Sequence, residues 1–232
     1  MLAKAWMTTD VVTVHEDTPI TKASIIMKEK NIRSLPIVNK DGKLLGIVTD
    51  RHLKAALPSK ATTLDIYELH YLISKIKVKD LMTRDPVFVR PDETVEFGAV
   101  LMLENKISSL PVIDEEDSLI GIITQTDIFK VLIDITGAYT GGVQFAFSLD
   151  DRPGSIREVA DLIRSHGGRL VSILSTCETA GHGRHNVYIR TRSLPEDKTR
   201  DLVRDLEKKF ALIYTARDFL EEVENRRIRI PY

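Results

Sequence analysis

The sequence is poor in cysteine, in long apolar runs and in excess charge, and each shortage narrows what the protein can be. Its single cysteine, Cys177, excludes an intrachain disulfide and fits a reducing compartment. No apolar run approaches membrane-spanning length, and residues 1–10 lack the apolar core of a signal peptide. The formal net charge is −1, so no strong attraction to nucleic acid or anionic membrane is expected. We therefore expect a cytoplasmic protein that binds neither nucleic acid nor membrane.

Motifs for common catalytic chemistry are also absent. The sequence has no glycine-rich phosphate loop with a lysine, no nucleophile elbow and no evident acid–base pair. His182 and His185 have a spacing that metal sites use, but they lie in a glycine-rich turn without a cysteine or carboxylate partner at ligand spacing. We therefore expect a protein that is not an enzyme, needs no cofactor and holds no metal.

The sequence does contain an internal repeat. A shift of 75 positions places Met7 on Met82, residues 32–36 on 107–111, and residues 46–49 on 121–124. A constant offset without gaps indicates a duplicated unit. Two related units of this size can bury their open apolar sheet faces against each other about a pseudo-twofold axis.

Each copy predicts the same order of elements. A short β-rich segment precedes a helix whose apolar residues recur with helical spacing, as at Ile20, Ala23 and Met27. Two strands joined by a polar turn follow, and then a second helix. The predicted segments are 11–14, 35–38 and 44–48 with a helix ending near 57, and 87–89, 110–113 and 119–123 with a helix ending near 136.

The corner between the last strand and the second helix is where we expect chemistry. In the second copy, Thr124, Thr126 and Asp127 fall in the first turn of the helix, where free N–H groups and the helix dipole favour an anion or a sugar–phosphate. The first copy keeps a threonine, Thr49, but has His52 where the second has Asp127. An aspartate in a first turn can also serve only as a helix cap.

A different pattern starts near residue 139. Glycines in residues 139–142 predict a hinge, and residues 143–216 predict the order βαββαβ. A charged helix is expected after residue 217, and residues 59–79 between the two copies predict a connecting strap.

The doubled Met-Thr-x-Asp opening, the doubled Ser-Leu-Pro and the doubled Gly-x-x-Thr corner together resemble a tandem pair of CBS domains, named for cystathionine beta-synthase. The resemblance implies an adenosine-containing ligand (AMP, ADP, ATP or S-adenosylmethionine) in a cleft between the copies, with Thr124 and Asp127 on the ribose. The family pattern completes this cleft with residues of the other copy. The implied nucleotide-binding set is Thr124, Thr126, Asp127, Met7, Val12, Ile32, Arg33 and Ser34.

The resemblance also implies a mirror cleft at the first corner. His52 departs from the family's aspartate, and a neutral imidazole accepts only one hydrogen bond, so it cannot hold a ribose diol with two. We expect this cleft to be empty, weaker or tuned to another ligand. Its implied set is Thr49, Arg51, His52, Met82, Val87, Ile107, Ser108 and Ser109.

The segment Asp151-Arg152-Pro153-Gly154-Ser155, with the helix and Gly-Gly turn that follow it, resembles an ACT domain, an amino-acid-sensing module. The resemblance implies an amino acid bound at Asp151, Pro153, Gly154 and Ser155; a purely structural or dimerising module is the alternative. Together with the strap around residues 64–70, the arrangement is similar to the acetoin-utilisation regulatory protein family.

The predicted fold is therefore α+β: a CBS pair built from two ββα-type repeats, followed by a ferredoxin-like ACT domain. The predicted parts are residues 1–58 (first CBS domain), 59–79 (strap), 80–138 (second CBS domain), 139–142 (hinge), 143–216 (ACT domain) and 217–232 (terminal helix and tail). We expect a homodimeric energy sensor that regulates an unidentified protein target. The alternative is a constitutive dimerisation scaffold with vestigial clefts.

Overall fold

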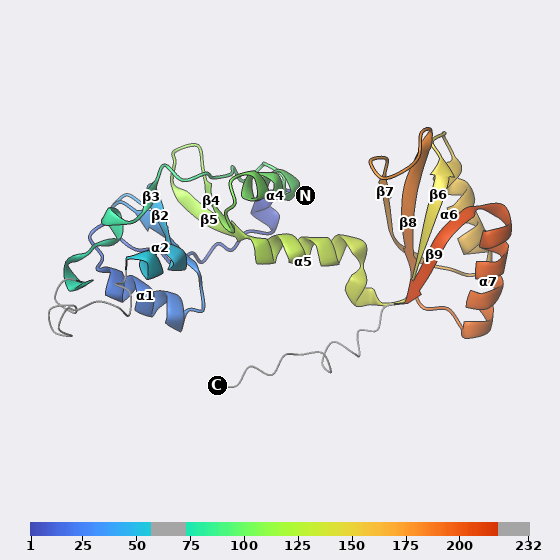
Figure 1. Cartoon of the computed structure of the whole chain (residues 1–232), viewed down its shortest axis with the longest axis horizontal. Helices are drawn as coiled ribbons and strands as arrows, with labels where there is room; N and C mark the ends of the chain where they lie inside the picture. The colour runs from blue at the N-terminus through green and yellow to red at the C-terminus, as the bar shows by residue number, and fades with distance from the viewer. Residues whose placement is uncertain (57–72, 218–232) are drawn as a thin grey trace. The chain divides into compact units, whose positions relative to one another are not determined.

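A computed structural model describes residues 1–56 and 73–217 of the chain. The predicted terminal helix and tail, and most of the predicted strap, lie outside these residues. The chain forms two compact units, Met1–Phe129 and Lys130–Tyr232, coloured blue to green and green to red in Figure 1. The boundary between them falls earlier than the predicted hinge. Within the described ranges, no helix has both the length and the apolar character that a membrane crossing requires.

Both copies of the repeat lie in the first unit, and each forms a helix, a β-hairpin and a second helix, as predicted. In the first copy these are α1 (Ile20–Glu29), β1 (Ser34–Val38), β2 (Leu44–Thr49) and α2 (Asp50–Ala55). In the second they are α4 (Val95–Glu104), β4 (Ser109–Ile113), β5 (Leu119–Thr124) and α5 (Gln125–Thr136), the last of which continues into the second unit. Short 3-10 turns, η1 (Ala3–Ala5) and η2 (Val78–Asp80), precede the opening segments of the two copies, which begin at Met7 and Met82.

The apolar stripe predicted for the first helix is confirmed. Ile20, Ala23 and Met27 are buried on one face of α1, where they pack with Leu35 of β1 and Val48 of β2. The predicted β-rich openings are wrong as strands, because they make only isolated bridges, Val14 with Ile37 and Val89 with Val112. Each opening runs beside the hairpin of its own copy for too short a distance to form a ladder.

The residues after η1 and η2 exchange partners between the copies. Thr8 and Ile122 donate their N–H groups to each other's carbonyl oxygens at 3.0 Å, so the first opening pairs with β5. In the mirror arrangement, β3 (Thr83–Arg84) pairs with β2, with Thr83 opposite Ile47. Each copy therefore completes the last strand of the other.

Equivalent residues also meet where the copies adjoin. The Ser109 hydroxyl lies 3.0 Å from the Ser34 hydroxyl, and these serines occupy the same position in the repeat. The two hairpin turns pair as well, since Leu44 N–H donates to the Asp117 carbonyl at 3.2 Å and Leu119 N–H to the Gly42 carbonyl at 3.1 Å. These like-to-like contacts are what the predicted pseudo-twofold axis requires.

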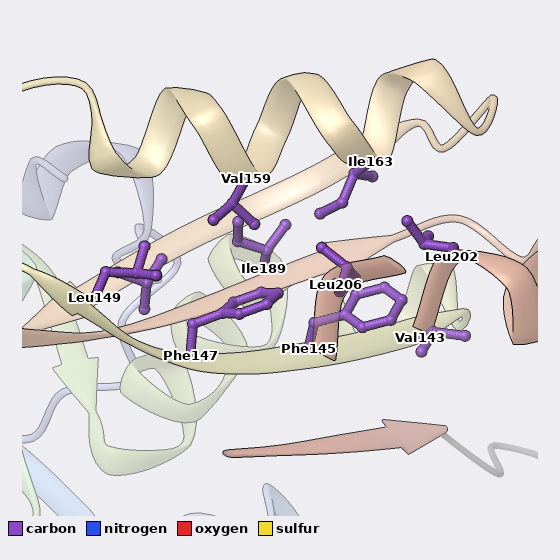
Figure 2. Packing of buried hydrophobic residues seen from close by; sticks show 10 residues of the cluster. Val143, Phe145, Phe147, Leu149, Val159, Ile163, Ile189, Leu202 and Leu206 are labelled. Atoms are coloured by element: carbon purple, nitrogen blue, oxygen red, sulfur yellow. The ribbon is translucent and has the colours of Figure 1, made fainter. Parts of the chain in front are cut away.

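The second unit has the predicted order βαββαβ. Its elements are β6 (Val143–Asp150), α6 (Ser155–Ser165), β7 (Leu170–Thr176), β8 (Arg184–Thr191), α7 (Glu196–Lys209) and β9 (Ala211–Arg217). The strands form one antiparallel sheet in the order β7-β8-β6-β9, which is the strand order of a ferredoxin-like fold. Figure 2 shows Val159 and Ile163 of α6 over Phe147 and Phe145 of β6, in a core that α7 completes.

The end of α5 is held by the sheet of the second unit. The carbonyl oxygen of Thr136 accepts hydrogen bonds from Ser172 Oγ and Arg190 Nε, both at 2.8 Å. Gly137 follows in the left-handed conformation with φ 66°, which glycine adopts without steric cost. A 3-10 turn, η3 (Ala138–Thr140), then leads to Gly141 and Gly142. The predicted hinge is thus partly an ordered helical turn.

Candidate ligand-binding site

The second corner holds a buried carboxylate. Asp127 is the third residue of α5 and is only 6% exposed. Its Oδ2 accepts the Thr124 N–H at 3.0 Å and the Thr124 hydroxyl at 2.7 Å. Two donors from one residue fix the orientation of the carboxylate.

The first corner has the same backbone frame with a different acceptor. The Thr49 side chain accepts the His52 N–H at 3.3 Å, and His52 Nδ1 accepts the Thr49 N–H at 3.4 Å. A ring nitrogen that accepts a hydrogen bond carries no proton, so this contact corresponds to a neutral imidazole protonated on Nε2. One corner therefore presents an anion and the other a neutral ring.

The segment before each Leu-Pro lies beside the corner of its own copy. Asp50 N–H donates to the Arg33 carbonyl at 3.0 Å, and Gln125 N–H donates to the Ser108 carbonyl at 3.0 Å. The Gln125 side chain also reaches the Ile107 carbonyl at 3.4 Å. These backbone contacts lie within one copy, and the assignment of Arg33 to the second cleft and of Ile107 with Ser108 to the first stays a prediction.

The two methionines, Met7 and Met82, each lie beside the last strand of the opposite copy. A Cβ atom at Gly121 would collide with the side chain of Met7, and one at Gly46 would come within 2.7 Å of Met82 Sδ. Each glycine therefore lets the opening of one copy approach the last strand of the other. Ser34 reaches the second copy through its hydrogen bond with Ser109.

The remaining predicted residues are less closely tied to a corner. Val12 and Ile32 are half-buried and pack on the apolar core of the first copy, and Val87 is half-buried in the second. Thr126 and Arg51 are exposed in the first turns of their helices. At the first corner, the Lys54 ammonium 2.9 Å away holds the pKa of Asp50 below its ordinary value.

The turn between β6 and α6 brings together three polar side chains. Ser155 Oγ lies 3.4 Å from His185 Nε2, and His185 Nδ1 lies 3.3 Å from Asp151 Oδ1. Gly154 has φ 91°, and a Cβ atom there would meet open space. Beside the turn, a bidentate pair with Glu158 at 2.8 and 2.7 Å raises the pKa of Arg152 and lowers that of Glu158.

His185 is the residue that the sequence did not place at this turn. Its position 30 residues from Ser155 gives no local signal, and its spacing from His182 indicates nothing about this turn. The atoms follow the order of a Ser–His–Asp triad, but Ser155 is only 5% exposed, which favours a structural link over a nucleophile. Among the residues that the structure describes, no three potential metal-ligating side chains come together.

The family comparison decides what the first unit is. The CBS domain family matches residues 3–59 and 78–134. A CBS domain-containing protein of Dictyostelium discoideum is 32% identical over 141 residues, which cover 58% of this chain and 93% of that protein. The chain belongs to the CBS domain family. The predicted tandem pair is therefore confirmed, and the family match ends at residue 134, before the second unit's sheet.

Solved structures of CBS pairs resemble the same part of the chain. CBSX2 of Arabidopsis thaliana is 29% identical and superposes with a TM-score of 0.51, covering 59% of this chain and 96% of that one. A proposed acetoin utilization protein of Vibrio cholerae, AcuB, is also 29% identical, with a TM-score of 0.50 over 60% of this chain and 95% of that one. A CBSX2 structure in complex with AMP is 34% identical, with a TM-score of 0.49 over 58% and 98%.

Several larger relatives are enzymes, and this chain matches only a small share of each. The matched part covers 21% of an inosine-5'-monophosphate dehydrogenase and 23% of a homoserine O-acetyltransferase, both archaeal. The shared part therefore says nothing by itself about what those enzymes catalyse.

Proposed function

We propose that this CBS pair is a non-enzymatic regulator that binds an adenosine-containing ligand at the second corner. The observation that carries the proposal is the Asp127 carboxylate, buried beside the first turn of α5 and oriented by Thr124. An oriented anion at this place suits the two adjacent hydroxyls of a ribose. Each charge-assisted hydrogen bond of this kind contributes about 1.5–3 kcal/mol.

The fixed orientation of the Asp127 carboxylate supports this role. Thr124 donates both its N–H and its hydroxyl to one carboxylate oxygen of Asp127. These bonds remove part of the entropic cost of binding, because the acceptor is already held in place.

The rest of the proposed site follows from the chemistry of a nucleotide. Met7, Val12 and Ile32 supply apolar contacts for an adenine, and Ser34 lies nearby through Ser109. Thr126 and the N-terminus of α5 suit a phosphate, as does the cationic side chain of Arg33. The backbone contacts of Gln125 add Ile107 and Ser108 to the set at this corner.

The first corner is proposed as the weaker site. His52 offers a neutral ring whose Nδ1 already accepts from Thr49. Arg51, Met82, Val87 and Ser109 complete this cleft in the proposal, but none of them replaces the missing anion. A nucleotide that binds here lacks the carboxylate that accepts the ribose hydroxyls at the second corner.

Regulation requires that binding shifts a conformational equilibrium. A ligand does this only by its differential affinity for two states. We propose that the signal passes along α5 and residues 137–142 to the second unit, and from a homodimer to an unidentified protein target.

We further propose that the second unit is an ACT-type module with an amino-acid site at Asp151, Pro153, Gly154 and Ser155. The likeness to the Vibrio AcuB protein makes acetoin utilisation the pathway to test first.

A constitutive scaffold is the second candidate, and one observation favours it. The bonds between Asp127 and Thr124 are also those of a helix cap, which needs no ligand. In that case both corners have a structural role, and the protein's melting temperature is the same with and without nucleotides or amino acids.

Calorimetric titration with AMP, ADP, ATP and S-adenosylmethionine separates the two. The regulator requires saturable binding of at least one of them to the wild-type protein. Asp127→Asn keeps an acceptor for the cap but loses the charge, so binding should weaken by about 2–3 kcal/mol, or roughly 30- to 150-fold in Kd. Asp134→Asn, which changes an exposed aspartate on the same helix, is the matched control. No binding at millimolar ligand, or equal binding by Asp127→Asn and wild type, contradicts the proposal.

A further inference from the structure

Helix α5 is longer than its counterpart in the first copy. It has twelve residues, Gln125–Thr136, whereas α2, at the equivalent position of the repeat, has six, Asp50–Ala55. The residues of α5 from Lys130 onward belong to the second unit. The helix that begins at the second corner is therefore also the helix that ends in the second unit.

The last carbonyl of α5 is bound by two side chains of the sheet. The Thr136 oxygen accepts hydrogen bonds from Ser172 Oγ and Arg190 Nε, both at 2.8 Å. Ser172 of β7 and Arg190 of β8 lie opposite each other in register, so both side chains lie on one face of the sheet. Ile189, next to Arg190, is buried on the other face, where α6 and α7 pack. The end of α5 is therefore held on the face opposite those two helices.

Arg190 is well suited to hold the end of a helix. The last carbonyls of a helix have no partner within it, and they carry the negative end of the helix dipole, which favours a cation. Arg190 is only 5% exposed, and burial lowers its pKa from the ordinary value of an arginine. A buried charge is costly without hydrogen bonds, so the bond to Thr136 is costly to lose. Gly137 lets the chain approach the sheet this closely, because a Cβ atom there would collide with Val171.

We propose that Arg190 and Ser172 form a clamp that couples the second corner to the sheet of the second unit. The coupling rests on the proposed nucleotide site, whereas the clamp itself is a feature of the second unit alone. Asp127 lies in the first turn of α5 and Thr136 in the last, so a ligand at the corner and the clamp act on the same helix. The signal crosses to β7 and β8 at Thr136, before the chain reaches residues 137–142. By linkage, an event that moves these two strands also changes the affinity for the nucleotide.

Hydrogen exchange of the full-length protein without nucleotide tests the clamp. Arg190→Met keeps the length of the side chain but removes its donors, and Arg192→Met, at an exposed arginine two positions further on, is the matched control. Amides in the last turn of α5 should exchange at least about tenfold faster in Arg190→Met, because a hydrogen bond from a charged group is lost. Arg192→Met should exchange at the wild-type rate. Equal rates in the two variants overturn the clamp.

Hydrogen exchange with AMP, ADP, ATP and S-adenosylmethionine, in separate samples, tests the coupling. In the wild type, a nucleotide that binds should change the exchange rates in β7 and β8. This change should be lost in Arg190→Met, although calorimetry still detects binding. A change that persists in Arg190→Met, or that is absent from a wild type with bound nucleotide, overturns the coupling. A wild type that binds none of the four contradicts the proposed function and the coupling together, while the exchange without nucleotide still decides the clamp.

Ser172→Ala is a second variant that disturbs the packing less. Arg190 is buried, so its replacement also alters the contacts around it, whereas Ser172→Ala removes a single hydroxyl from a half-buried position. It should change both measurements in the same direction as Arg190→Met and by less. Ser175→Ala, at an exposed position of the same strand, is its control. A Ser172→Ala variant that behaves like Ser175→Ala in both measurements overturns the clamp of two donors.

Discussion

The two corners of the CBS pair share a backbone frame and differ in one acceptor. At both, a threonine ends a strand and the third helical residue accepts that threonine's N–H, at 3.0 Å for Asp127 and 3.4 Å for His52. The roles of the threonine side chains are reversed. Thr124 donates its hydroxyl to Asp127, whereas Thr49 accepts from the His52 N–H. The duplicated frame thus keeps its helix caps while its chemistry diverges.

The difference between Asp127 and His52 distinguishes what the fold requires at this position from what a ligand would require. An imidazole occupies the same capping position as the carboxylate, so the fold does not require Asp127 to be an acid. A buried carboxylate costs free energy through desolvation, which the bonds from Thr124 offset in part. The repeat keeps the more costly carboxylate at the second corner only. This is the arrangement that a ligand site at one corner of the pair would require.

Exchanging the two acceptors should have the largest effect. Asp127→His should abolish nucleotide binding, and His52→Asp should raise the number of bound nucleotides per chain from one to two, because the carboxylate supplies the ribose grip. The double exchange should restore a single site. Calorimetric stoichiometry measures all three variants. Binding that follows neither acceptor would show that the ribose is held elsewhere.

Removing the two threonine hydroxyls should destabilise the chain unequally. Thr124→Ala withdraws a donor from a buried carboxylate, for which we expect a loss of about 1.5–3 kcal/mol. Thr49→Ala removes a helix cap, for which about 1 kcal/mol is typical. Urea unfolding compares the two variants, with a serine at each position as the control that keeps the hydroxyl. Equal losses would mean that the carboxylate adds nothing to the cap.

Replacing Gly46 and Gly121 by alanine should destabilise the protein unequally, because the two glycines face different neighbouring atoms. At Gly46 a Cβ atom would lie 2.7 Å from the backbone oxygen of Thr83, which cannot move without disturbing the β2–β3 pairing. At Gly121 the nearest atoms all belong to the flexible side chain of Met7. Gly46→Ala should therefore cost about 1–3 kcal/mol, as overpacking does, and Gly121→Ala less. A larger loss for Gly121→Ala in urea unfolding would reverse this assignment.

The smallest effect on stability is expected at Asp17, just before α1. Hydrogen bonds from Lys77 and Lys79, both at 2.8 Å, lower the pKa of Asp17 to about 2. Because the folded pKa lies below the ordinary value of 3.8, the stabilisation is present above about pH 4 and is lost as the pH falls through 2. Asp17 is exposed, so the effect on stability is small.

Thermal melts of Asp17→Asn measure this effect. The variant should melt slightly below the wild type at pH 7, and the difference should shrink toward pH 2 and disappear below it. Asp92→Asn, the equivalent change in the second copy, is the control, since Asp92 makes no ion pair with the residues that the structure describes. A difference between Asp17→Asn and wild type of the same size at pH 7 and at pH 2 would mean that the ion pair is not its cause.

The sequence predicted most of the fold because the fold repeats itself. The 75-residue offset and the apolar spacing of Ile20, Ala23 and Met27 are local signals, and both are confirmed by the structure. The pairing of Thr8 with Ile122 and the position of Arg33 beside Asp50 depend on contacts between distant segments, which no spacing reveals. His185 was missed at the turn of the second unit for the same reason.

The central claim is that one corner, and not both, holds the ribose. A crystal structure of the full chain grown with a saturating adenine nucleotide tests it most directly. We expect the ribose hydroxyls within hydrogen-bond distance of the Asp127 carboxylate, and no ribose held by His52 at the first corner. A ribose held at Thr49 and His52, or equal occupancy of the two corners, would contradict the account.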